Sequence, residues 1–365
     1  MRCDLVVRPT WKAPYPPTDG VIKVSFLLNE WYAAAWSGEV REAPVGRTLL
    51  NQPVVLFRKS DGCVAALQDR CAHRFVPLRM GSIQGDTIQC GYHGLRYDEH
   101  GRCVLNPHGT GKIPDTARVR SYPVAEKFGA VWVWMGEPAG CDAGRIHDFS
   151  PFSDSNFTAV TGYMHVAANY QLIADNLLDL SHGQFLHPLF TNPAGPPALE
   201  RSPAEENTVW ARFVRKRQLP NQYFQMLGFP KDQLGDHRNY MRWNPPSVLL
   251  LDVGMTDADG DPRAGLSIPT AHLLTAETET TTHYFWGMAR NFRLQDQELS
   301  ERLLRIGKDI FENEDKPMIE AQQRALGAST DLLAARPALL DTDRPSIRAR
   351  RMLAARLSSQ ASSGL

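Results

Sequence analysis

Two short pairs of cysteine and histidine stand close together in the first third of the chain. Cys71 is followed by His73, and sixteen residues separate this pair from Cys90 and His93. Thiolate sulfur and imidazole nitrogen are ligands of zinc and of iron–sulfur clusters. Zinc-finger sites usually group Cys with Cys and His with His, whereas each pair here mixes the two types, which lets each loop give one ligand to each iron of a two-iron cluster. A zinc site remains open as the alternative.

A second group of metal-ligand residues lies in the segment DNLLDLSHGQFLHP. Asp179 precedes His182 by three residues, and His187 follows His182 by five. On a helix, Asp179 and His182 would share a face, and we expect the helix to loosen after Gly183, ahead of Pro188. Two histidines near a helix end suit a metal ion that keeps open coordination positions.

A carboxylate to complete this group is expected from a long helix predicted over residues 296–326. Its apolar stripe includes Ile310 and Phe311, and the positions four residues further on are Glu314 and Asp315. A carboxylate on the buried face of a helix needs a partner or a metal ion. Periodicity alone leaves the choice between these two acids open.

These segments together resemble a known family. Cys-x-His and Cys-x-x-His, within HRFVPL and CGYHGLRYD, resemble the Rieske signature of oxygenases, and NYQLIADNLLDLSHGQFLH and ENEDKPMIEAQQ are similar to the catalytic segments of Rieske non-haem iron aromatic oxygenases. The similarity covers residues 26–358 and is to the branch of the vanillate and dicamba O-demethylases and toluenesulfonate methyl-monooxygenase. It implies that a [2Fe–2S] cluster is held by Cys71, His73, Cys90 and His93, and one Fe(II) by His182, His187 and Asp315.

The resemblance also implies roles for two residues beside the iron. Asp179 would be a bridging acid that hydrogen-bonds His182 and, across a subunit interface of a homotrimer, a cluster histidine, His93. Such a contact would orient a ligand and link the two redox centres. Asn176, one turn before Asp179, would lie close to the iron.

The substrate pocket is expected to be largely apolar, with a few placed polar groups. His272, Leu251 and Ile306 occupy positions that face the substrate in the family. Leu251 and Ile306 stand where dicamba-type relatives carry polar or aromatic contacts, which argues against dicamba itself. Two strand arginines, Arg242 and Arg290, are candidate partners for an aromatic carboxylate, although surface ion pairs are the commoner role of strand arginines.

The activity implied is that of a terminal oxygenase component. A separate NAD(P)H-linked reductase would deliver electrons through the cluster, and O2 would be used to hydroxylate a methoxy or methyl group of a small aromatic acid, with formaldehyde released in O-demethylation. The alternatives are an aromatic ring hydroxylase or dihydroxylase, a Rieske electron-transfer protein without oxygenase activity, and a binding protein stapled by zinc.

Composition excludes several other classes. Lys plus Arg and Asp plus Glu number 40 each, so no overall field favours nucleic acid or an anionic membrane. We find no apolar run long enough for a membrane span and no secretory signal at the N-terminus. With no export signal and sparse cysteines, we expect a cytoplasmic protein.

The elements that must position these residues fall into two groups. Short strand-like runs with turn signals fill residues 45–136, including a hairpin at Asp61-Gly62. The segment GEPAGCDAGRIHDFSPFSD marks a boundary, and strands FTAVTGYMHV, TVWARFVRK, SVLLLDVG and TTTHYFWGMARNF follow it. We predict an α+β chain: an all-β Rieske domain over 24–145, then an antiparallel-sheet catalytic domain of helix-grip type with a long C-terminal helix over 146–358. Residues 1–23 are expected to be a disordered tail or an over-called start, and 359–365 a disordered tail.

Overall fold

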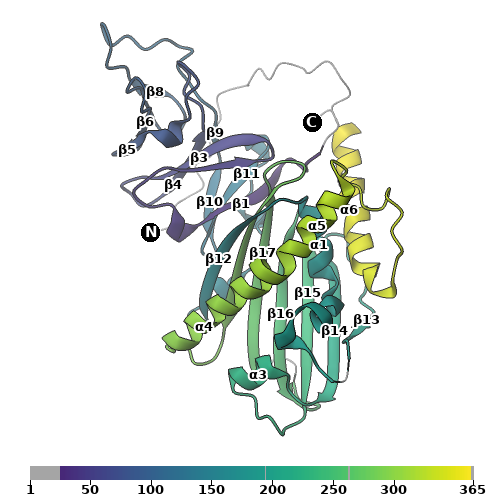
Figure 1. Ribbon diagram of the computed structural model, residues 1–365. Coiled ribbons are helices and arrows are strands. Elements are labelled where there is room, and N and C mark those ends of the chain that lie inside the picture. Colours follow the sequence, from purple (N-terminus) through teal and green to yellow (C-terminus); the bar gives the residue numbers. More distant parts are fainter. Residues whose placement is uncertain (1–24, 194, 262–263, 363–365) are drawn as a thin grey trace. The chain divides into compact units, whose positions relative to one another are not determined.

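The computed structural model describes residues 25–193, 195–261 and 264–362 (Figure 1). The chain divides into two compact units, the first formed by residues 1–146 with 359–365 and the second by residues 147–358. The expected N-terminal tail over 1–23 lies outside the described residues. No helix among the described residues is both long and apolar enough to cross a membrane.

The first unit is built from antiparallel sheets, as predicted. The strand orders are β1-β11-β10, β2-β3-β4-β9 and β5-β6-β7-β8. The predicted hairpin joins β3 to β4, with Gly62 at a φ of 88°, a value that glycine adopts without strain. The strands are β1 (Glu30–Trp36), β2 (Val45–Leu49), β3 (Gln52–Arg58), β4 (Val64–Gln68), β5 (Ser82–Gln84), β6 (Thr87–Gln89), β7 (Arg96–Tyr97), β8 (Cys103–Leu105), β9 (Ser121–Tyr122), β10 (Val124–Lys127) and β11 (Ala130–Met135).

The second unit contains a seven-stranded antiparallel sheet in the order β12-β18-β17-β16-β15-β14-β13. Helix α4 packs against β12 and β18, and α1 packs against β15 and β17 (Figure 1). The strands are β12 (Thr158–Val166), β13 (Ala198–Glu200), β14 (Val209–Gln218), β15 (Gly235–Asn244), β16 (Val248–Asp257), β17 (Leu266–Ala276) and β18 (Thr282–Arg290). The helices are α1 (Tyr170–Leu178), α2 (Gly183–Leu186), α3 (Gln222–Leu227), α4 (Gln297–Lys308), α5 (Lys316–Leu326) and α6 (Arg344–Ser362).

The predicted long helix over 296–326 is present, and its middle is π-helical. Asp296 caps α4 by accepting from the Leu299 N–H at 2.9 Å. The π-helical segment Asp309–Asp315 then joins α4 to α5 without a break in the rod (Figure 1). Because a π turn takes in one residue more than an α turn, the residue that follows Ile310 on the same face is Asp315.

The prediction of a disordered tail over 359–365 is wrong for residues 359–362, which continue α6. Within the first unit, the side-chain amide of Gln360 donates to the Phe26 carbonyl at 3.0 Å and accepts from the Leu28 N–H at 2.6 Å. These bonds satisfy backbone groups that would otherwise need water. A contact between opposite ends of the chain therefore orders a segment whose composition is typical of a tail.

Candidate metal centres

The two loops that carry the cysteines have the same backbone hydrogen bonds. In each, the cysteine N–H donates to the carbonyl five residues later, at 2.9 Å for Cys71 and 2.8 Å for Cys90. The cysteine carbonyl in turn accepts from the N–H four residues later, at 3.0 Å in both loops. That fourth position has a positive φ in both, at Phe75 and Gly94. The loops are thus two copies of one tight turn, each presenting a cysteine from its base.

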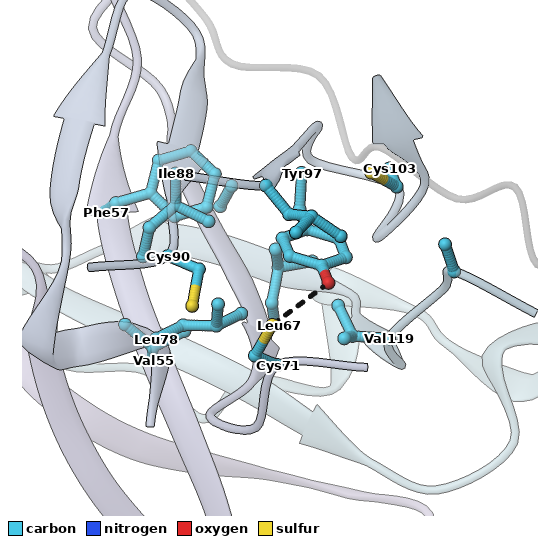
Figure 2. Packing of buried hydrophobic residues seen from close by; sticks show 13 residues of the cluster. Val55, Phe57, Leu67, Cys71, Leu78, Ile88, Cys90, Tyr97, Cys103 and Val119 are labelled. Carbon is cyan, nitrogen blue, oxygen red and sulfur yellow. Dashed lines mark hydrogen bonds between the residues drawn. The ribbon is translucent and has the colours of Figure 1, made fainter. Parts of the chain in front are cut away.

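Both cysteine side chains are buried in the apolar cluster of the first unit (Figure 2). The Tyr97 hydroxyl points at the Cys71 sulfur, 3.3 Å away. Burial raises the pKa of the Cys90 thiol, whereas the backbone N–H groups of Tyr92 and His93 favour its thiolate. Hydrogen bonds to buried sulfur are among the features that tune iron–sulfur clusters.

The two histidines of these loops lie next to each other and are at least partly exposed to solvent. The rings of His73 and His93 are 4.5 Å apart, edge to face. His108 Nε2 donates to the His93 carbonyl at 2.7 Å, and this hydrogen bond helps to fix the backbone of the second loop. Two buried sulfurs and two neighbouring, accessible imidazoles match a cluster with Cys ligands on one iron and His ligands on the other.

The three residues expected to hold the mononuclear iron converge in the second unit. The candidate ligand atoms of His182, His187 and Asp315 all lie within 4.8 Å of one another. Each histidine Nε2 is 3.4 Å from Asp315 Oδ1. Two imidazoles and one carboxylate with space on one side are typical of non-haem Fe(II) sites, so the donor set fits the metal that the family resemblance implies.

The other ring nitrogen of each histidine has its own acceptor. His182 Nδ1 donates to the Asp179 carbonyl at 2.5 Å, and His187 Nδ1 donates to Glu314 Oε2 at 2.6 Å. With the proton on Nδ1, the lone pair of each ring lies on Nε2, the atom that faces Asp315. The backbone and a carboxylate therefore set the tautomer that metal binding needs.

The predicted helical relation between Asp179 and His182 is wrong. Helix α1 ends at Leu178, and Asp179 has φ −118° and ψ 86°. Its carboxylate accepts from the Ser181 N–H at 3.0 Å and so starts the next turn, a common role of Asp. Asp179 reaches His182 with its backbone carbonyl, not with the carboxylate that we expected.

The choice between Glu314 and Asp315 resolves into two roles. Asp315 is buried and faces both histidines, whereas Glu314 accepts a hydrogen bond from Nδ1 of His187, the ring nitrogen that does not face Asp315. Burial raises the pKa of Asp315, but hydrogen bonds from His182 and His187 outweigh this and lower it far below its usual range. Asn176 Nδ2 also donates to Asp315 Oδ1, at 3.1 Å, as its expected place near the metal suggests.

A cavity of about 100 Å³ opens from this group of residues and is largely apolar. His272 and Leu251 line it, as predicted, whereas Ile306 does not. Ile310 and Phe311, one turn further on, line it instead, because Ile306 belongs to α4 and precedes the π-helical segment. 

The polar lining of the cavity differs in part from the prediction. Burial lowers the pKa of His272 to about 3, its Nδ1 is 2.6 Å from the Tyr284 hydroxyl, and its buried Nε2 has no hydrogen-bond partner among the described residues. Arg242 and Arg290 do not line the cavity, whereas Arg215 does. Its signal in the sequence is weak: Arg215 continues the alternate positions of Ala211 and Phe213 in β14.

Comparison with known proteins agrees with this geometry. Residues 30–123 match the Rieske [2Fe–2S] domain, and residues 166–359 match the vanillate O-demethylase oxygenase C-terminal domain. The chain belongs to the Rieske non-haem iron oxygenases. It is therefore an oxygenase component, and its cofactors are a Rieske [2Fe–2S] cluster and a mononuclear iron.

Individual relatives resemble the chain over most of its length. The oxygenase component of chloroacetanilide N-alkylformylase from Rhizorhabdus wittichii is 38% identical over 90% of this chain and 94% of its own. The oxygenase component of dicamba O-demethylase from Stenotrophomonas maltophilia is 37% identical over 90% of this chain and 97% of its own. A crystal structure of dicamba monooxygenase with non-haem iron and dicamba superposes with a TM-score of 0.79 at 34% identity, covering 93% of this chain and 99% of that one. Because such relatives are oxygenase components, a separate electron-donating partner is implied.

Proposed function

We propose that this oxygenase component hydroxylates the methoxy or methyl group of a small aromatic acid, with formaldehyde as the product of O-demethylation. The observation that carries the proposal is the cavity: its lining is largely apolar with a few placed polar groups, as in small-ligand sites, and it has the three candidate iron ligands in its wall. The oxygenase components of dicamba and vanillate O-demethylases among the relatives favour this reaction.

The residues have distinct tasks in this reading. When bound, the cluster supplies single electrons and the iron supplies oxygen activation. Nε2 of His182 and of His187, with the Asp315 carboxylate, would hold the iron. Asn176 keeps the carboxylate turned towards the histidines through its hydrogen bond. The apolar wall keeps water from the reacting group, and His272 Nε2 offers a polar contact to the substrate.

A methoxy group that gains a hydroxyl becomes a hemiacetal, which collapses to a phenol and formaldehyde. One atom of O2 enters the product and the other leaves as water, with electrons from the partner protein and protons from solvent. A methyl group treated in the same way becomes a benzylic alcohol. The same site therefore accounts for both outcomes, and the substrate decides between them.

The test is a coupled assay with a reductase, NADH and a panel of methoxy- and methyl-substituted benzoates and benzenesulfonates. We expect NADH oxidation that is matched by formaldehyde or by a hydroxylated product. His182→Ala should abolish turnover and keep the cluster's visible and EPR spectra, while His165→Ala, which changes a histidine outside the cavity in the same unit, should keep both. Protein loaded with cluster and iron that oxidises none of the panel contradicts the proposal, and a cis-diol without formaldehyde assigns a ring dihydroxylase.

Three further features stay predictions, the first two from the family resemblance and the third from the sparse cysteines and the lack of an export signal. They are the homotrimer, the NAD(P)H dependence of the reductase, and the cytoplasmic location. The bridging role of Asp179 belongs with the homotrimer, because it needs a cluster histidine from a neighbouring subunit. Sedimentation of the purified protein measures the trimer directly, and Asp179→Asn should then slow electron transfer between the centres without loss of either metal.

A further inference from the structure

Arg215 is a buried cation in the wall of the substrate cavity. It lies on β14 opposite His237 of β15, on the sheet face that also presents Asn239 to the cavity. Only 9% of its surface is exposed. Residues paired across an antiparallel ladder point to the same face, so this arrangement is set by the register of the sheet.

Within the described part of the chain, no acid pairs with the guanidinium of Arg215. Its Nη2 donates to Gln184 Oε1 at 3.0 Å and to the Gly195 carbonyl at 2.8 Å, both of them neutral acceptors. Its Nε is buried without a hydrogen-bond partner among the described residues. Burial lowers the pKa of Arg215, and no neighbouring carboxylate opposes that effect.

Two other buried arginines of the second unit are paired with acids. Arg238 contacts Asp252 at 2.9 Å, and Arg350 contacts Asp175 at 2.6 Å. Burying an ion costs several kcal/mol unless a counter-charge and hydrogen bonds compensate for it. Arg290 is also buried, and among the described residues its Nη2 donates only to two carbonyls and the Ser300 hydroxyl, but it does not line the cavity, whereas Arg215 does.

The rest of the lining supplies no counter-charge either. Asp315 is the one carboxylate among the described residues that line the cavity, and the two candidate ligand histidines face it. Burial and the charge of Arg215 lower the pKa of His237 to about 3, which keeps that ring neutral. Through Gln184, which lies between His182 and His187 in sequence, the guanidinium is tied to the segment that carries both histidines.

We propose that Arg215 is the counter-ion for the acid group of the substrate, a carboxylate or a sulfonate, and that it selects anionic aromatic substrates over neutral ones. This inference rests on the proposed function and specifies its substrate class. An arginine presents parallel N–H donors that match planar or tetrahedral oxyanions. His272, which is neutral, and the apolar wall recognise the remainder of the molecule.

Binding is the sharpest test because it does not depend on turnover. Calorimetry on the cluster- and iron-loaded protein measures the affinity for 4-methoxybenzoate and for 4-methoxybenzenesulfonate, with the neutral 4-methoxybenzamide as the reference probe. Arg215→Gln should weaken binding of the acids by roughly 10- to 100-fold and leave binding of the amide within about twofold. Arg215→Lys, which keeps the charge but not the fork, should fall between wild type and Arg215→Gln.

The matched control is Arg212→Gln. Arg212 lies on the same strand, where its guanidinium packs over the rings of Trp210 and Tyr240, and it does not line the cavity. This variant should bind acids and amide as wild type does. Iron content and the cluster spectrum of Arg215→Gln should match wild type, and its thermal midpoint should be no lower, since removing a buried charge without a counter-ion removes the cost of burying it.

Two results overturn the inference. One is equal weakening of acid and amide in Arg215→Gln, which marks a structural role. The other is the absence of measurable binding of either acid to wild type. Failure of the proposed reaction is a separate result, because an enzyme that forms no formaldehyde and no hydroxylated product can still bind acids through Arg215.

Discussion

The two histidines expected to hold the iron differ in the acceptor that orients their second ring nitrogen. His182 is oriented by a neutral backbone carbonyl and His187 by the carboxylate of Glu314. A charged acceptor makes an imidazole a more basic ligand than a neutral one does. Burial lowers the pKa of His187, but Asp315 and Glu314 together raise it above its ordinary value. We therefore expect His187 to contribute more to iron affinity than His182 does.

Glu314→Gln tests this expectation. The amide keeps an acceptor for His187 Nδ1 but loses the charge, so we expect iron affinity to fall by about 10- to 100-fold with the Rieske spectrum unchanged. Iron bound per protein after dialysis against a graded chelator gives the measurement. Glu312→Gln, in the same π-helical segment but outside the cavity lining, is the control, and a loss in this variant as large as in Glu314→Gln would contradict the assignment.

The hydrogen bond from Tyr97 to the Cys71 sulfur leads to a second prediction. A donor on a cluster ligand stabilises the reduced, more negative cluster, so Tyr97→Phe should lower the reduction potential. A hydrogen bond worth about 0.5–1.5 kcal/mol corresponds to roughly 20–60 mV for a one-electron couple. Potentiometric titration followed by EPR measures the shift. The control is Tyr92→Phe, which changes an exposed ring in the same loops and should leave the reduction potential unchanged. An unchanged potential in Tyr97→Phe would show that the Tyr97 hydrogen bond does not tune the cluster.

At the scale of elements, α1 fixes the iron-binding residues through neighbouring side chains. Asn176 donates to Asp315, while Asp175 receives Arg350 of α6 through several hydrogen bonds, the shortest at 2.6 Å. Burial raises the pKa of Asp175 despite the charge of Arg350. The attraction within the pair therefore does not offset the cost of burying the carboxylate, and the pair acts chiefly to set the position of α6 against α1.

A double-mutant cycle separates these effects. Asp175→Leu alone leaves a buried guanidinium unpaired and should lower the unfolding free energy of the second unit by about 3–5 kcal/mol, as should Arg350→Met alone. The double variant should return to within roughly 1 kcal/mol of wild type, because neither charge is then left without its partner. Urea unfolding followed by circular dichroism gives the values. Additive losses in the double variant would show instead that the ion pair itself is stabilising.

At the scale of the whole molecule, the two kinds of chemistry belong to separate units. The cluster ligands lie within the first unit, and the residues expected to hold the iron lie within the second. Each unit has its own apolar core, so unfolding need not be a single two-state process. Loss of one centre is therefore expected to leave the fold of the other unit intact.

The second unit should lose stability in acid because its sheet buries a histidine, His237. The folded-state pKa of His237 is lowered to about 3 by burial, so the unfolded chain binds a proton that the folded unit excludes. The stability contributed is fully present above the unfolded pKa of about 6.5 and is lost as the pH falls towards about 3. Between about pH 7.5 and pH 5.5 the loss is roughly 1.4 kcal/mol from this residue.

His237→Leu should remove that part of the pH dependence. Urea unfolding of the second unit at the two pH values gives the difference in slope, while the bleaching of the cluster absorption follows the first unit as an internal control. An unchanged pH dependence in the variant would show that His237 is protonated when folded. The ring packs edge to face on Phe224 at 4.6 Å, so leucine fills part of the same space.

Much of this site could be predicted from short segments. The Cys and His pairs, His182, His187 and the two acids are local patterns, and hairpins such as the one at Asp61-Gly62 follow from two adjacent residues. The apolar runs predict strands β12, β14, β16 and β18, and all four lie in the one antiparallel sheet, where β12 pairs with β18. 

The strands that were missed carry cavity residues. In β15 the positions facing the cavity are polar, so the strand has no apolar run. Strand β17 contains Pro269, a residue that is rare inside strands. Its lack of an N–H is tolerated there because the ladder with β18 begins at Thr270. 

The remaining features depend on contacts between distant segments. The contact of Asn176 with Asp315 and the helical end of α6 held by Gln360 both need a partner far away in sequence. Arg215 looks like any strand arginine until the sheet register and the contacts with Gln184 and Gly195 place it in the wall of a cavity whose one described carboxylate, Asp315, faces the two candidate ligand histidines. Residue types and their local spacing are enough to identify the candidate metal ligands. Burial, strand register and the absence of a counter-charge arise only when the chain is folded, because they depend on which distant residues become neighbours in space.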